Sequence, residues 1–463
     1  MYYYWDGRVF MFASELKGLL AAGIKRRIDR DAVSLYMSLG FIPAPHSIIE
    51  GVWKLEAGQN LLFSLRQKTI RTTRFYIPPT YEPQPTKNLV PRGRELLEKA
   101  VHYRSIADVD VGTFLSGGLD SSIVTALLQR QANRPIHSFS IGFELAAFDE
   151  SRYARLMAEH LGTKHHHAYF TEKDYARIRK RIPDIYDEPL ADTSIYPTVK
   201  VAELAARHVK ACLTGEGGDE LFGGYALHRA VAKMDLLFRM PVGVRKMGAH
   251  LTRRLSKQHR LRRGFALSLQ PHQDLLANIF CRLPADRIAH AWYKKHFAAL
   301  LKKNGTLTES VIRFDLFHHT VPDKLNVKVD RAGMASSLEI RCPFLDKELL
   351  SFSAQIPTKH KLSRAGSKTK VLLRSIAKPW LPREILQRKK QGFSAPAFAW
   401  VQNEPETIVH AQKELRGLLR NQQRKQLHAI TQKITARQKL TRYEEDRLFR
   451  ATLLQQWRER WEG

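Results

Sequence analysis

The sequence predicts an α/β protein with a doubly wound parallel sheet and a helical C-terminal part. Two observations support this prediction. Between about residues 88 and 214, apolar segments of strand length alternate with segments whose apolar residues recur at helical spacing, which is typical of parallel strands joined by crossover helices. Beyond Tyr225 the spacing is mostly helical to the end of the chain.

The expected elements of the sheet region follow one another in order. The first strand is an apolar run at 109–115, and a glycine turn separates it from a helix. The inner face of that helix is expected to consist of Ile123, Val124, Leu127 and Leu128. A second helix is expected over 150–161, because Gly162 follows the last residue of its pattern. The later strands are expected at 136–141, 165–170 and 209–214.

The first 80 residues have a different pattern. Short apolar stretches such as Val9–Ala13 alternate with turn residues, and a helical stretch covers Asp31–Leu39. The proline-rich connector Pro78–Pro85 is the expected domain boundary. We therefore expect one domain over 1–80 and a second over 81–463, with a helical tail from about residue 400.

Composition excludes some classes of protein. Of the 463 residues, 43% are hydrophobic and 26% are charged, which are ordinary proportions for a globular protein. The chain has no run of about eighteen apolar residues, and its first residues lack the pattern of a secretory signal. Three cysteines are too few for a disulfide framework or a thiolate metal site. We expect no membrane span and a reducing, cytoplasmic location.

The charge balance is strongly basic, with 76 Lys and Arg against 45 Asp and Glu, a formal net charge of +31. Such an excess attracts polyanions. The basic residues recur in separate segments, among them Lys25–Arg30 and Arg416–Arg437, and solvated helix faces account for most such runs. No specific nucleic-acid partner is predicted.

The strongest local motif is Ser116-Gly-Gly-Leu-Asp-Ser-Ser122, between the first expected strand and its helix. Parallel-sheet proteins bind ligands at the carboxyl ends of strands. The two glycines let backbone amides approach an anion, the serine hydroxyls can donate hydrogen bonds, and the helix N-terminus adds positive partial charge. Asp120 would repel phosphates unless Mg²⁺ bridges them. A capped glycine turn would explain the glycines and serines but not the whole motif.

This motif resembles the pyrophosphate loop of the N-type ATP pyrophosphatases, which include asparagine, β-lactam, argininosuccinate, GMP and NAD synthetases and tRNA-modifying enzymes. The resemblance implies ATP as a substrate, Mg²⁺ as a cofactor, and adenylation of a carboxyl or carbonyl group with release of pyrophosphate. The Gly-Lys-Ser/Thr of a Walker loop is absent from the motif, which disfavours γ-phosphate transfer.

A second glycine-rich segment, Thr214–Tyr225, follows the fourth expected strand and carries three acidic residues. Acidic groups beside a phosphate site require a cation or shifted pKa values. The segment resembles the second nucleotide motif of asparagine synthetases, which implies that Asp219 joins Asp120 on magnesium and that Glu216 is catalytic, supporting formation of the acyl-adenylate. The ATP-binding residues implied by the resemblance are Leu115, Ser116, Gly117, Gly118, Asp120, Ser121, Ser122, Ile141, Thr214 and Gly215.

Three later segments, Asp187–Ser194, Lys328–Asp346 and Lys389–Ser394, also resemble asparagine synthetases. In the last of them, Lys390 matches a family lysine that stabilises negative charge on the reacting adenylate and pyrophosphate, and Lys389 is the alternative. Charged residues of the second segment, taken singly, could equally form surface ion pairs. The substrate-binding residues implied by the resemblance are Asp192, Glu220, Asp330 and Arg331.

The first residues look like the final third of the N-terminal nucleophile hydrolase domain of glutamine-hydrolysing asparagine synthetases. That domain begins with a catalytic cysteine, whereas Met1 precedes Tyr2 here and the first cysteine is Cys212. We therefore expect no glutamine hydrolysis by this chain, and ammonia that is free or delivered by a separate glutaminase subunit. Apolar residues left exposed, namely Val9, Phe10 and Phe12, would suit a partner chain or a homodimer.

Three consecutive histidines, His165–His167, lie in an expected strand. Neighbouring strand residues point to opposite faces, so the three side chains cannot converge on one metal ion. We do not expect this run to bind a metal.

The sequence thus predicts a ligase that adenylates a carboxylate with Mg-ATP and then lets ammonia attack the activated carbonyl, giving an amide and AMP. The resemblance implies L-aspartate as the acid and asparagine as the product. The alternatives are amidation of another carboxylate, as in surface-polymer biosynthesis, a tRNA-modifying ATP pyrophosphatase, which the charge would suit, and a remnant that only binds nucleotide.

Overall fold

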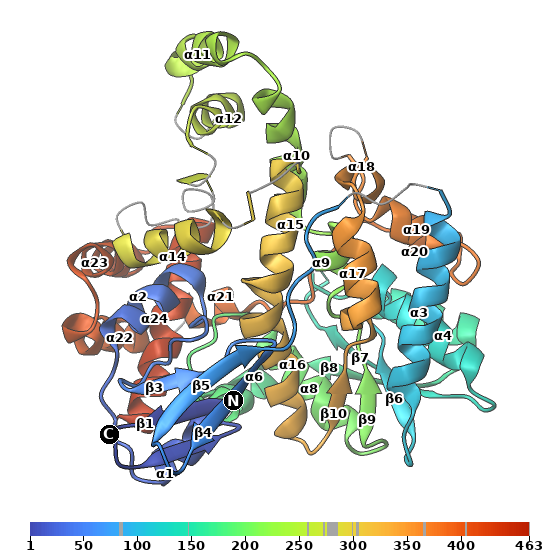
Figure 1. Ribbon diagram of the computed structural model, residues 1–463, viewed down its shortest axis with the longest axis horizontal. Coiled ribbons are helices and arrows are strands. Elements are labelled where there is room, and N and C mark those ends of the chain that lie inside the picture. Colours follow the sequence, from blue (N-terminus) through green and yellow to red (C-terminus); the bar gives the residue numbers. More distant parts are fainter. Residues whose placement is uncertain are drawn as a thin grey trace.

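The structure is a computed structural model, shown in Figure 1. It describes residues 1–82, 87–146, 148–256, 259–271, 274–275, 286–298, 300–301, 305–363, 367–402 and 405–462. Pro85 of the expected connector and Cys281 lie outside the described residues.

A five-stranded parallel sheet is the centre of the α/β part, with strand order β10-β9-β6-β7-β8. The chain extends from β6 in one direction through β7 and β8 and in the other through β9 and β10, so the order reverses between β6 and β9. In open α/β sheets such a reversal leaves a crevice at the carboxyl ends of the strands. The strands are β6 (Val111–Phe114), β7 (His137–Phe143), β8 (Lys164–Phe170), β9 (Ala211–Leu213) and β10 (Glu339–Arg341).

The four expected strands are all present, and β10 is an additional one. It has only three residues, two of them charged, and it pairs with β9 alone at the edge of the sheet. An edge strand tolerates charged side chains because one of its sides faces away from the other strands. Its pattern therefore lacks the apolar run that marks a buried strand.

Helices surround this sheet, and α5 and α8 both pack against β7 and β8. The four residues expected on the inner face of α4 are all at least 96% buried, and α5 ends at Gly162, whose φ of 68° is the left-handed conformation expected of a helix-ending glycine. The helices of this part are α3 (Leu89–Ser105), α4 (Leu119–Gln131), α5 (Ser151–Leu161), α6 (Glu172–Arg179), α7 (Ile182–Tyr186), α8 (Ile195–Ala205), α9 (Gly218–Phe222), α16 (Asn326–Met334), α17 (Lys347–Gln355), α18 (Thr358–Lys361), α19 (Val371–Ala377) and α20 (Arg383–Gln387).

Beyond α9 the described chain is mostly helical, as predicted. Figure 1 shows α11 and α12 in an arm that extends from the body beyond α10 and α15, and α11 has no buried residue. The remaining helices are α10 (Ala226–Phe238), α11 (Val242–Leu251), α12 (Arg260–Ser268), α14 (Arg287–Ala298), α15 (Leu307–Phe317), α21 (Ala397–Gln402), α22 (Pro405–Glu414), α23 (Asn421–Thr435) and α24 (Arg442–Trp461). No helix among the described residues is long and apolar enough to cross a membrane.

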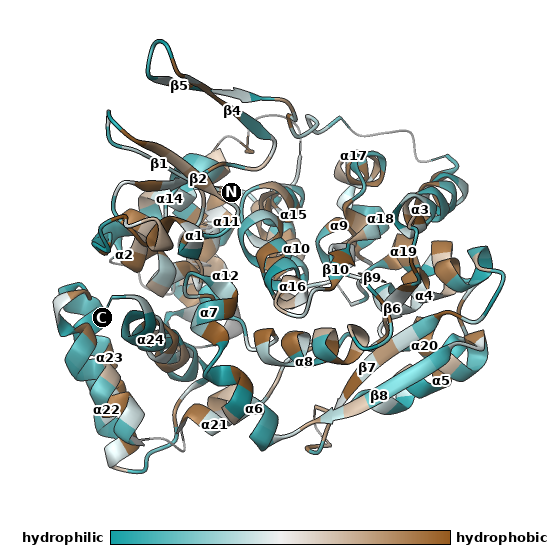
Figure 2. Ribbon diagram, turned by 90° about the horizontal axis from the view of Figure 1, so that it is seen from below, coloured by the Kyte–Doolittle hydropathy of each residue, from teal (hydrophilic) through white to brown (hydrophobic). Residues whose placement is uncertain are grey.

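The N-terminal part contains two small antiparallel sheets, one of order β2-β1-β3 and the other the hairpin β4-β5. The hairpin extends away from the body in Figure 2. Val9 and Phe12 are exposed as expected, whereas Phe10 stacks on Phe63 of the hairpin with ring centroids 4.3 Å apart. The elements are β1 (Tyr2–Trp5), β2 (Phe10–Ala13), α1 (Leu16–Ala21), α2 (Arg30–Leu39), β3 (Val52–Lys54), β4 (Gln59–Ser64) and β5 (Thr69–Arg74).

The N-terminal part shares a hydrophobic core with the C-terminal helices. Figure 1 shows α2 beside α23 and α24, and the Tyr36 hydroxyl of α2 donates to the Arg450 carbonyl of α24 at 2.9 Å. Tyr36 and Trp457 belong to one continuous cluster of buried apolar side chains. The first and last segments of the chain therefore fold against each other.

The buried residue Asp187 contacts both the N-terminal part and the C-terminal helix α24. Its side chain is inaccessible to solvent and accepts a hydrogen bond from the Leu16 amide at 2.7 Å, while its carbonyl accepts from the indole of Trp457. Burial raises the pKa of Asp187 to about 6, against the attraction of Lys17. The folded protein thus keeps a proton on this carboxyl that the unfolded chain releases near pH 4.

We expect Asp187→Asn to increase the unfolding free energy at pH 8 by about 1–3 kcal/mol and to leave it unchanged near pH 4. Because the folded pKa is raised, the stability contributed by this carboxyl is fully present below about pH 4 and is lost as the pH rises through about 6. Asparagine keeps the acceptor for Leu16 and does not ionise. Urea unfolding at the two pH values measures the difference.

Asp184→Asn is the matched control, since Asp184 is exposed and pairs with Arg460 at 2.7 Å on the surface. It should change the unfolding free energy by less than about 1 kcal/mol. Equal pH profiles for Asp187→Asn and the wild type would contradict the prediction.

Candidate active site

The loop Ser116–Ser122 joins β6 to α4 and is folded tightly on itself. Ser121 Oγ accepts from the Ser116 amide at 3.2 Å and donates to the Gly118 carbonyl at 3.2 Å. Gly117 has a φ of +67°, and a Cβ there would lie 2.4 Å from a backbone atom of Tyr153 in α5. Only glycine fits at this position, so the loop and the N-terminus of α4 are held against α5.

The second loop, which follows β9, lies directly on the first. A Cβ on Gly215 would be 2.6 Å from the Ser121 amide nitrogen, and one on Gly218 would be 2.6 Å from Asp120 Cγ. The two glycine-rich motifs, about a hundred residues apart in the sequence, thus meet backbone to backbone at the reversal of strand order.

We expect Gly215→Ala to lower the unfolding free energy by about 1–3 kcal/mol, because the methyl group meets backbone rather than a flexible side chain. Separation of the loops should also slow any reaction that needs both. Denaturant unfolding measures the first effect. Gly243→Ala is the control, since a Cβ there meets nothing within 4 Å, and equal destabilisation by both changes would contradict the packing argument.

The acidic residues of the two loops share one lysine. Lys370 Nζ lies 2.6 Å from Asp219 Oδ1 and also donates to Asp120 Oδ2, and Lys390 Nζ donates to Asp219 Oδ2. All three side chains that meet at Lys370 are at least 86% buried. Two carboxylates and two ammonium groups therefore alternate at the contact between the loops.

Burial and charge act in opposite directions on these carboxyls. Burial opposes ionisation of Asp219, but Lys370 and Lys390 outweigh it and hold the pKa of Asp219 well below its ordinary value. Burial raises the pKa of Asp120, against the attraction of Lys370. The pKa of Glu220 is raised to about 8, first by burial and then by repulsion from Asp219. The ionised Asp219 can thus bind a cation strongly. The same negative charge disfavours ionisation of a neighbouring carboxyl such as Glu220.

The carboxylates fit a magnesium ion. Asp120 Oδ1 is buried and has no hydrogen-bond partner among the described residues, and one ammonium already bridges Asp120 to Asp219. Oxygen ligands of this kind are those that Mg²⁺ binds beside phosphates. Asp120 and Asp219 are therefore the residues that could hold the ion.

A second ion-pair system borders the pocket. Lys328 Nζ lies 2.6 Å from Glu216 Oε1, and Asp192 Oδ2 lies 3.1 Å from Lys324 Nζ. Burial opposes ionisation of Lys328, but Glu216 and Asp192 raise the pKa of this lysine. Burial likewise opposes ionisation of Asp192, but Lys324 and Lys328 lower its pKa. The two ion pairs hold the Glu216 and Asp192 carboxylates in place at the edge of the pocket.

One pocket brings most of the predicted site residues together. Those that line it are Leu115, Ser116, Gly118, Asp120, Ser121, Ile141, Thr214, Gly215, Glu216, Asp219 and Lys390. Lys389 lines the pocket too, but of these two neighbouring lysines it is Lys390 that donates to Asp219. Gly117 and Ser122 are not among the lining residues, and the hydroxyl of Ser122 is fully buried behind the loop.

The four predicted substrate-binding residues do not line this pocket. Glu220 is buried beside it and accepts from the Tyr225 hydroxyl. On α16, Arg331 lies 3.0 Å from Glu15 and donates to the Ser14 carbonyl at 2.8 Å, so it contacts the N-terminal part. The neighbouring Asp330 has a side chain that is 60% exposed.

Lys370 and Arg388 are pocket residues that the sequence does not single out. Arg388 donates to the Gly117 carbonyl at 2.7 Å and pairs with Glu150, which fixes the outer side of the loop. Arg388 begins the basic run Arg388–Lys390, and Lys370 lies two residues after Lys368, in a chain with 76 Lys and Arg. Residue type alone therefore does not identify these two residues. For Arg388, its position two residues before Lys390 is a signal that could have identified it.

Residues 92–459 match the asparagine synthase family, and residues 1–76 match the glutamine amidotransferase domain family. The chain belongs to the asparagine synthase family. This confirms the resemblance drawn from the motifs, and it places the chain among ligases that form carbon–nitrogen bonds and use ATP.

Similar proteins of known name support the same assignment to the asparagine synthase family. The chain is 40% identical over 358 residues to "Putative asparagine synthetase (glutamine-hydrolyzing) 2" of Methanocaldococcus jannaschii, covering 74% of this chain and 69% of that protein. It is 32% identical over 408 residues to asparagine synthetase (glutamine-hydrolyzing) 1 of Bacillus subtilis, covering 85% and 63%. The chain thus spans about two thirds of the length of these relatives.

Proposed function

We propose that this chain adenylates a carboxylate, L-aspartate by preference, with ATP on a doubly wound sheet, and that ammonia then displaces AMP to give the amide, asparagine. The observation that carries the proposal is the meeting of the two glycine-rich loops, which brings Asp120, Asp219 and Lys390 to one pocket. Binding the nucleotide and the acid in one cleft turns an encounter of separate molecules into an oriented reaction.

The residues take distinct parts in this proposal. The glycine backbone of Ser116–Ser122 and the N-terminus of α4 receive the phosphates. Lys390 is already positioned at Asp219 and stabilises negative charge as pyrophosphate departs. Lys370 takes the same role from the other side of the pocket. Glu216 is held in place by its ion pair with Lys328. It supports formation of the acyl-adenylate at the carboxylate substrate.

Mg²⁺ held by Asp120 and Asp219 would neutralise phosphate charge and orient the pyrophosphate leaving group. The buried oxygen of Asp120 that has no hydrogen-bond partner among the described residues supports this assignment. In the absence of the ion, Lys370 balances the same two carboxylates.

The source of ammonia is the second part of the proposal. Residues 1–76 are interpreted as part of an N-terminal nucleophile hydrolase domain, and this segment contains no cysteine. We propose that the synthetase site receives ammonia that is free or delivered by a glutaminase subunit, in the cytoplasm. Phe12 on β2 and Val9, which directly precedes β2, are exposed. They offer apolar surface for such a subunit or for a second copy of the chain.

The test is release of pyrophosphate and AMP from ATP with Mg²⁺ and ammonium, with aspartate and a panel of other carboxylic acids. We expect aspartate-dependent release of both products in equal amounts, together with asparagine. Formation of ADP and phosphate would contradict adenylation. Release with another acid of the panel, but not with aspartate, would support the adenylation reaction and identify that acid as the substrate. No release with any acid would favour a remnant that only binds nucleotide.

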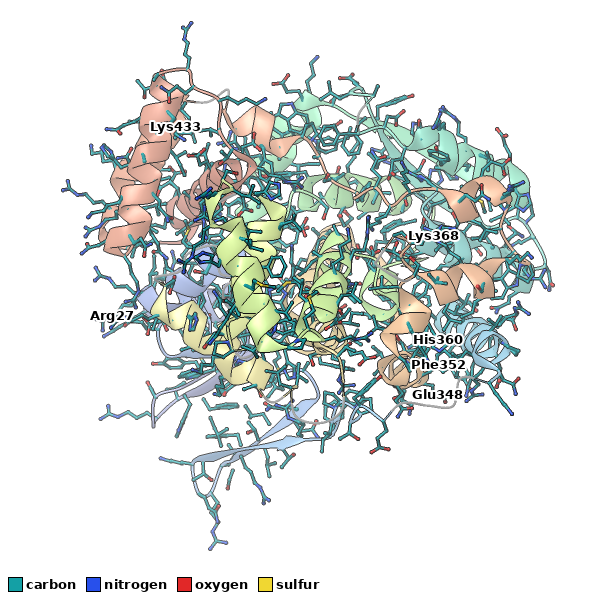
Figure 3. The ribbon with its side chains drawn as sticks, turned by 90° about the horizontal axis from the view of Figure 1, so that it is seen from above. Arg27, Glu348, Phe352, His360, Lys368 and Lys433 are labelled. Atoms are coloured by element: carbon teal, nitrogen blue, oxygen red, sulfur yellow. The ribbon has the colours of Figure 1, made fainter. Side chains whose placement is uncertain are left out.

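The strongly basic composition gives little support to the RNA-modifying alternative. Arg27, Lys368 and Lys433 lie on well-separated parts of the molecule in Figure 3. Several surface cations are paired, such as Lys433 with Glu444 at 2.6 Å. A tRNA-binding protein would be expected to gather its basic residues on one face.

A further inference from the structure

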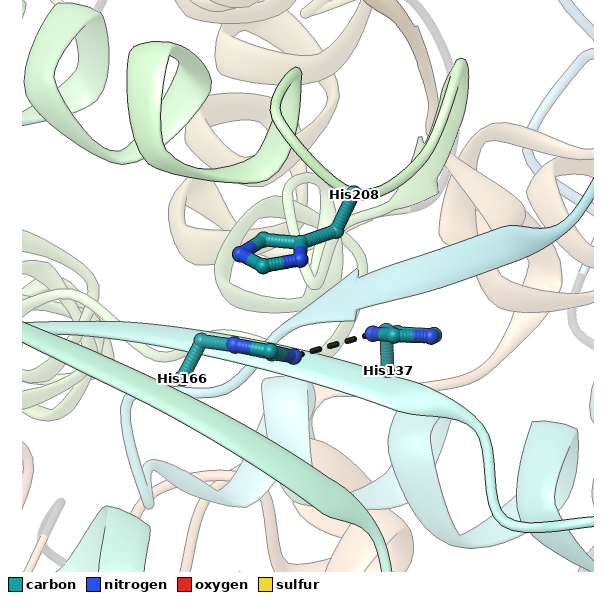
Figure 4. A group of neighbouring side chains, drawn as sticks. All are labelled: His137, His166 and His208. Atoms are coloured by element: carbon teal, nitrogen blue, oxygen red, sulfur yellow. Dashed lines mark hydrogen bonds between the residues drawn. The ribbon is translucent and has the colours of Figure 1, made fainter.

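A cluster of three histidines lies on the sheet, away from the ATP pocket. His137 is the first residue of β7, His166 is the third of β8, and His208 lies in the turn between α8 and β9. In the parallel register, His166 is opposite Phe139, so His137 and His166 are diagonal neighbours on one face of the sheet. Figure 4 shows the His208 ring over this pair.

The three rings bring one nitrogen each close together. One ligand atom from each lies within 4.8 Å of the other two, and His137 Nδ1 and His166 Nε2 are 2.9 Å apart. One of these two nitrogens donates a proton to the other in a hydrogen bond. A metal ion can replace that proton and bind both nitrogens. His165 and His167 both contact Ser140 Oγ, whereas His166, between them in the strand, meets two histidines from other elements.

We propose that His137, His166 and His208 bind one divalent transition-metal ion, with Zn²⁺ as the representative. Imidazole nitrogen suits zinc, copper and nickel, and three protein nitrogens with one open position form a frequent zinc geometry. Burial, followed by repulsion from His208 and His137, lowers the pKa of His166, and neutral rings have the lone pairs that a metal needs.

One ion can contact all three nitrogens only after rotation of the side chains, including that of His208. Its ring lies against the face of His166, with centroids 3.8 Å apart, instead of directing its lone pair at the other two nitrogens. Because His208 is exposed in a turn, rotation about its side-chain bonds can bring a nitrogen to the bonding distance of about 2.0–2.1 Å. Lys164, which lies close enough to lower the pKa of His137 and His166, weakens the site.

The site is distinct from the proposed ATP site and does not depend on it. Strands β7 and β8 begin at the end of the sheet opposite to the loops that follow β6 and β9. An ion bound here would connect two adjacent strands to the segment that leads into β9. Binding to the folded state alone would stabilise that state.

The test is metal titration of tag-free protein with Zn²⁺, by calorimetry, and with Co²⁺, by visible absorption. We expect one equivalent to bind, with the ligand-field spectrum of nitrogen-coordinated Co²⁺. Each of His137→Gln, His166→Ala and His208→Ala should weaken binding at least about tenfold, since even partners outside the ligand set affect metal affinity by that much. Zn²⁺ should raise the Tm of the wild type and not that of His208→Ala.

Two controls separate this site from other binding. His160→Ala removes an exposed histidine of α5 and should leave binding unchanged, and Asp219→Asn should still bind one equivalent if the ATP-site carboxylates are not involved. His208→Ala removes only an exposed turn side chain, so a folding defect is not expected to obscure the result. Failure of the wild type to bind Zn²⁺ at tenfold molar excess, or equal affinity in all variants, would overturn the proposal.

Discussion

Asp219→Asn is expected to lower the rate of pyrophosphate release by about a hundredfold to a thousandfold, the range for removing one preorganised charge from a transition-state site. Asp219 pairs with Lys370 and Lys390, and together with Asp120 it is placed to hold Mg²⁺ between the loops. Asparagine keeps the shape of the side chain and an acceptor oxygen but lacks the negative charge that attracts the ion and the ammonium groups.

The same substitution should leave the protein folded, because Lys370 keeps its pair with Asp120 and Lys390 is 38% exposed and can turn to solvent. Rates are measured by coupled detection of pyrophosphate at several Mg²⁺ concentrations. Asp110→Asn is the matched control, since Asp110 directly precedes β6 at the other end of the sheet and pairs with Arg134 on the surface. A rate for Asp219→Asn within threefold of the control would contradict the assignment.

Lys370→Met is expected to lower the unfolding free energy by about 3–5 kcal/mol, because it leaves two buried carboxylates without the cation between them. Lys370 is only 3% exposed and reaches Asp120 across 250 residues of sequence. Methionine has a similar stem and no charge. Added Mg²⁺ should restore part of the lost stability, since a divalent ion can bridge the same two carboxylates.

Urea unfolding of both proteins with and without Mg²⁺ measures this effect, and pyrophosphate release shows whether Lys370 also acts on the reaction. Lys368→Met is the control, since Lys368 lies two residues earlier and is exposed; it is labelled in Figure 3. It should change the unfolding free energy by less than about 0.5 kcal/mol. Equal unfolding free energies for Lys370→Met and the wild type would rule out the proposed bridge.

The sequence alone predicts the chemistry of each loop. Ser116–Ser122 and Thr214–Tyr225 each carry their glycines, hydroxyls and carboxylates within a dozen residues, and strand–loop–helix order decides that both face the carboxyl ends of parallel strands. Local spacing is likewise sufficient for β6, β7, β8 and β9 and for α4 and α5. It fails for β10, whose three residues at an edge have no apolar pattern to detect.

Substrate-binding roles for Asp330 and Arg331 remain predictions, and their location was not foreseeable. Resemblance identifies the segment, but α16 turns Arg331 toward Glu15 of the N-terminal part instead of the pocket. The direction in which a helix presents a given side chain depends on what packs against it, and here that partner lies more than three hundred residues earlier in the chain.

What the sequence determined by itself is the family and the composition of the two glycine-rich loops, because in each loop the groups expected to act together are neighbours along the chain. Only the tertiary structure decided that Lys370 balances Asp120 and Asp219, and that His137, His166 and His208 meet. A lysine among 76 basic residues, or a histidine among 19, carries no signal of its own. Its partners are fixed by strand order and by burial, which act between residues that are distant in sequence.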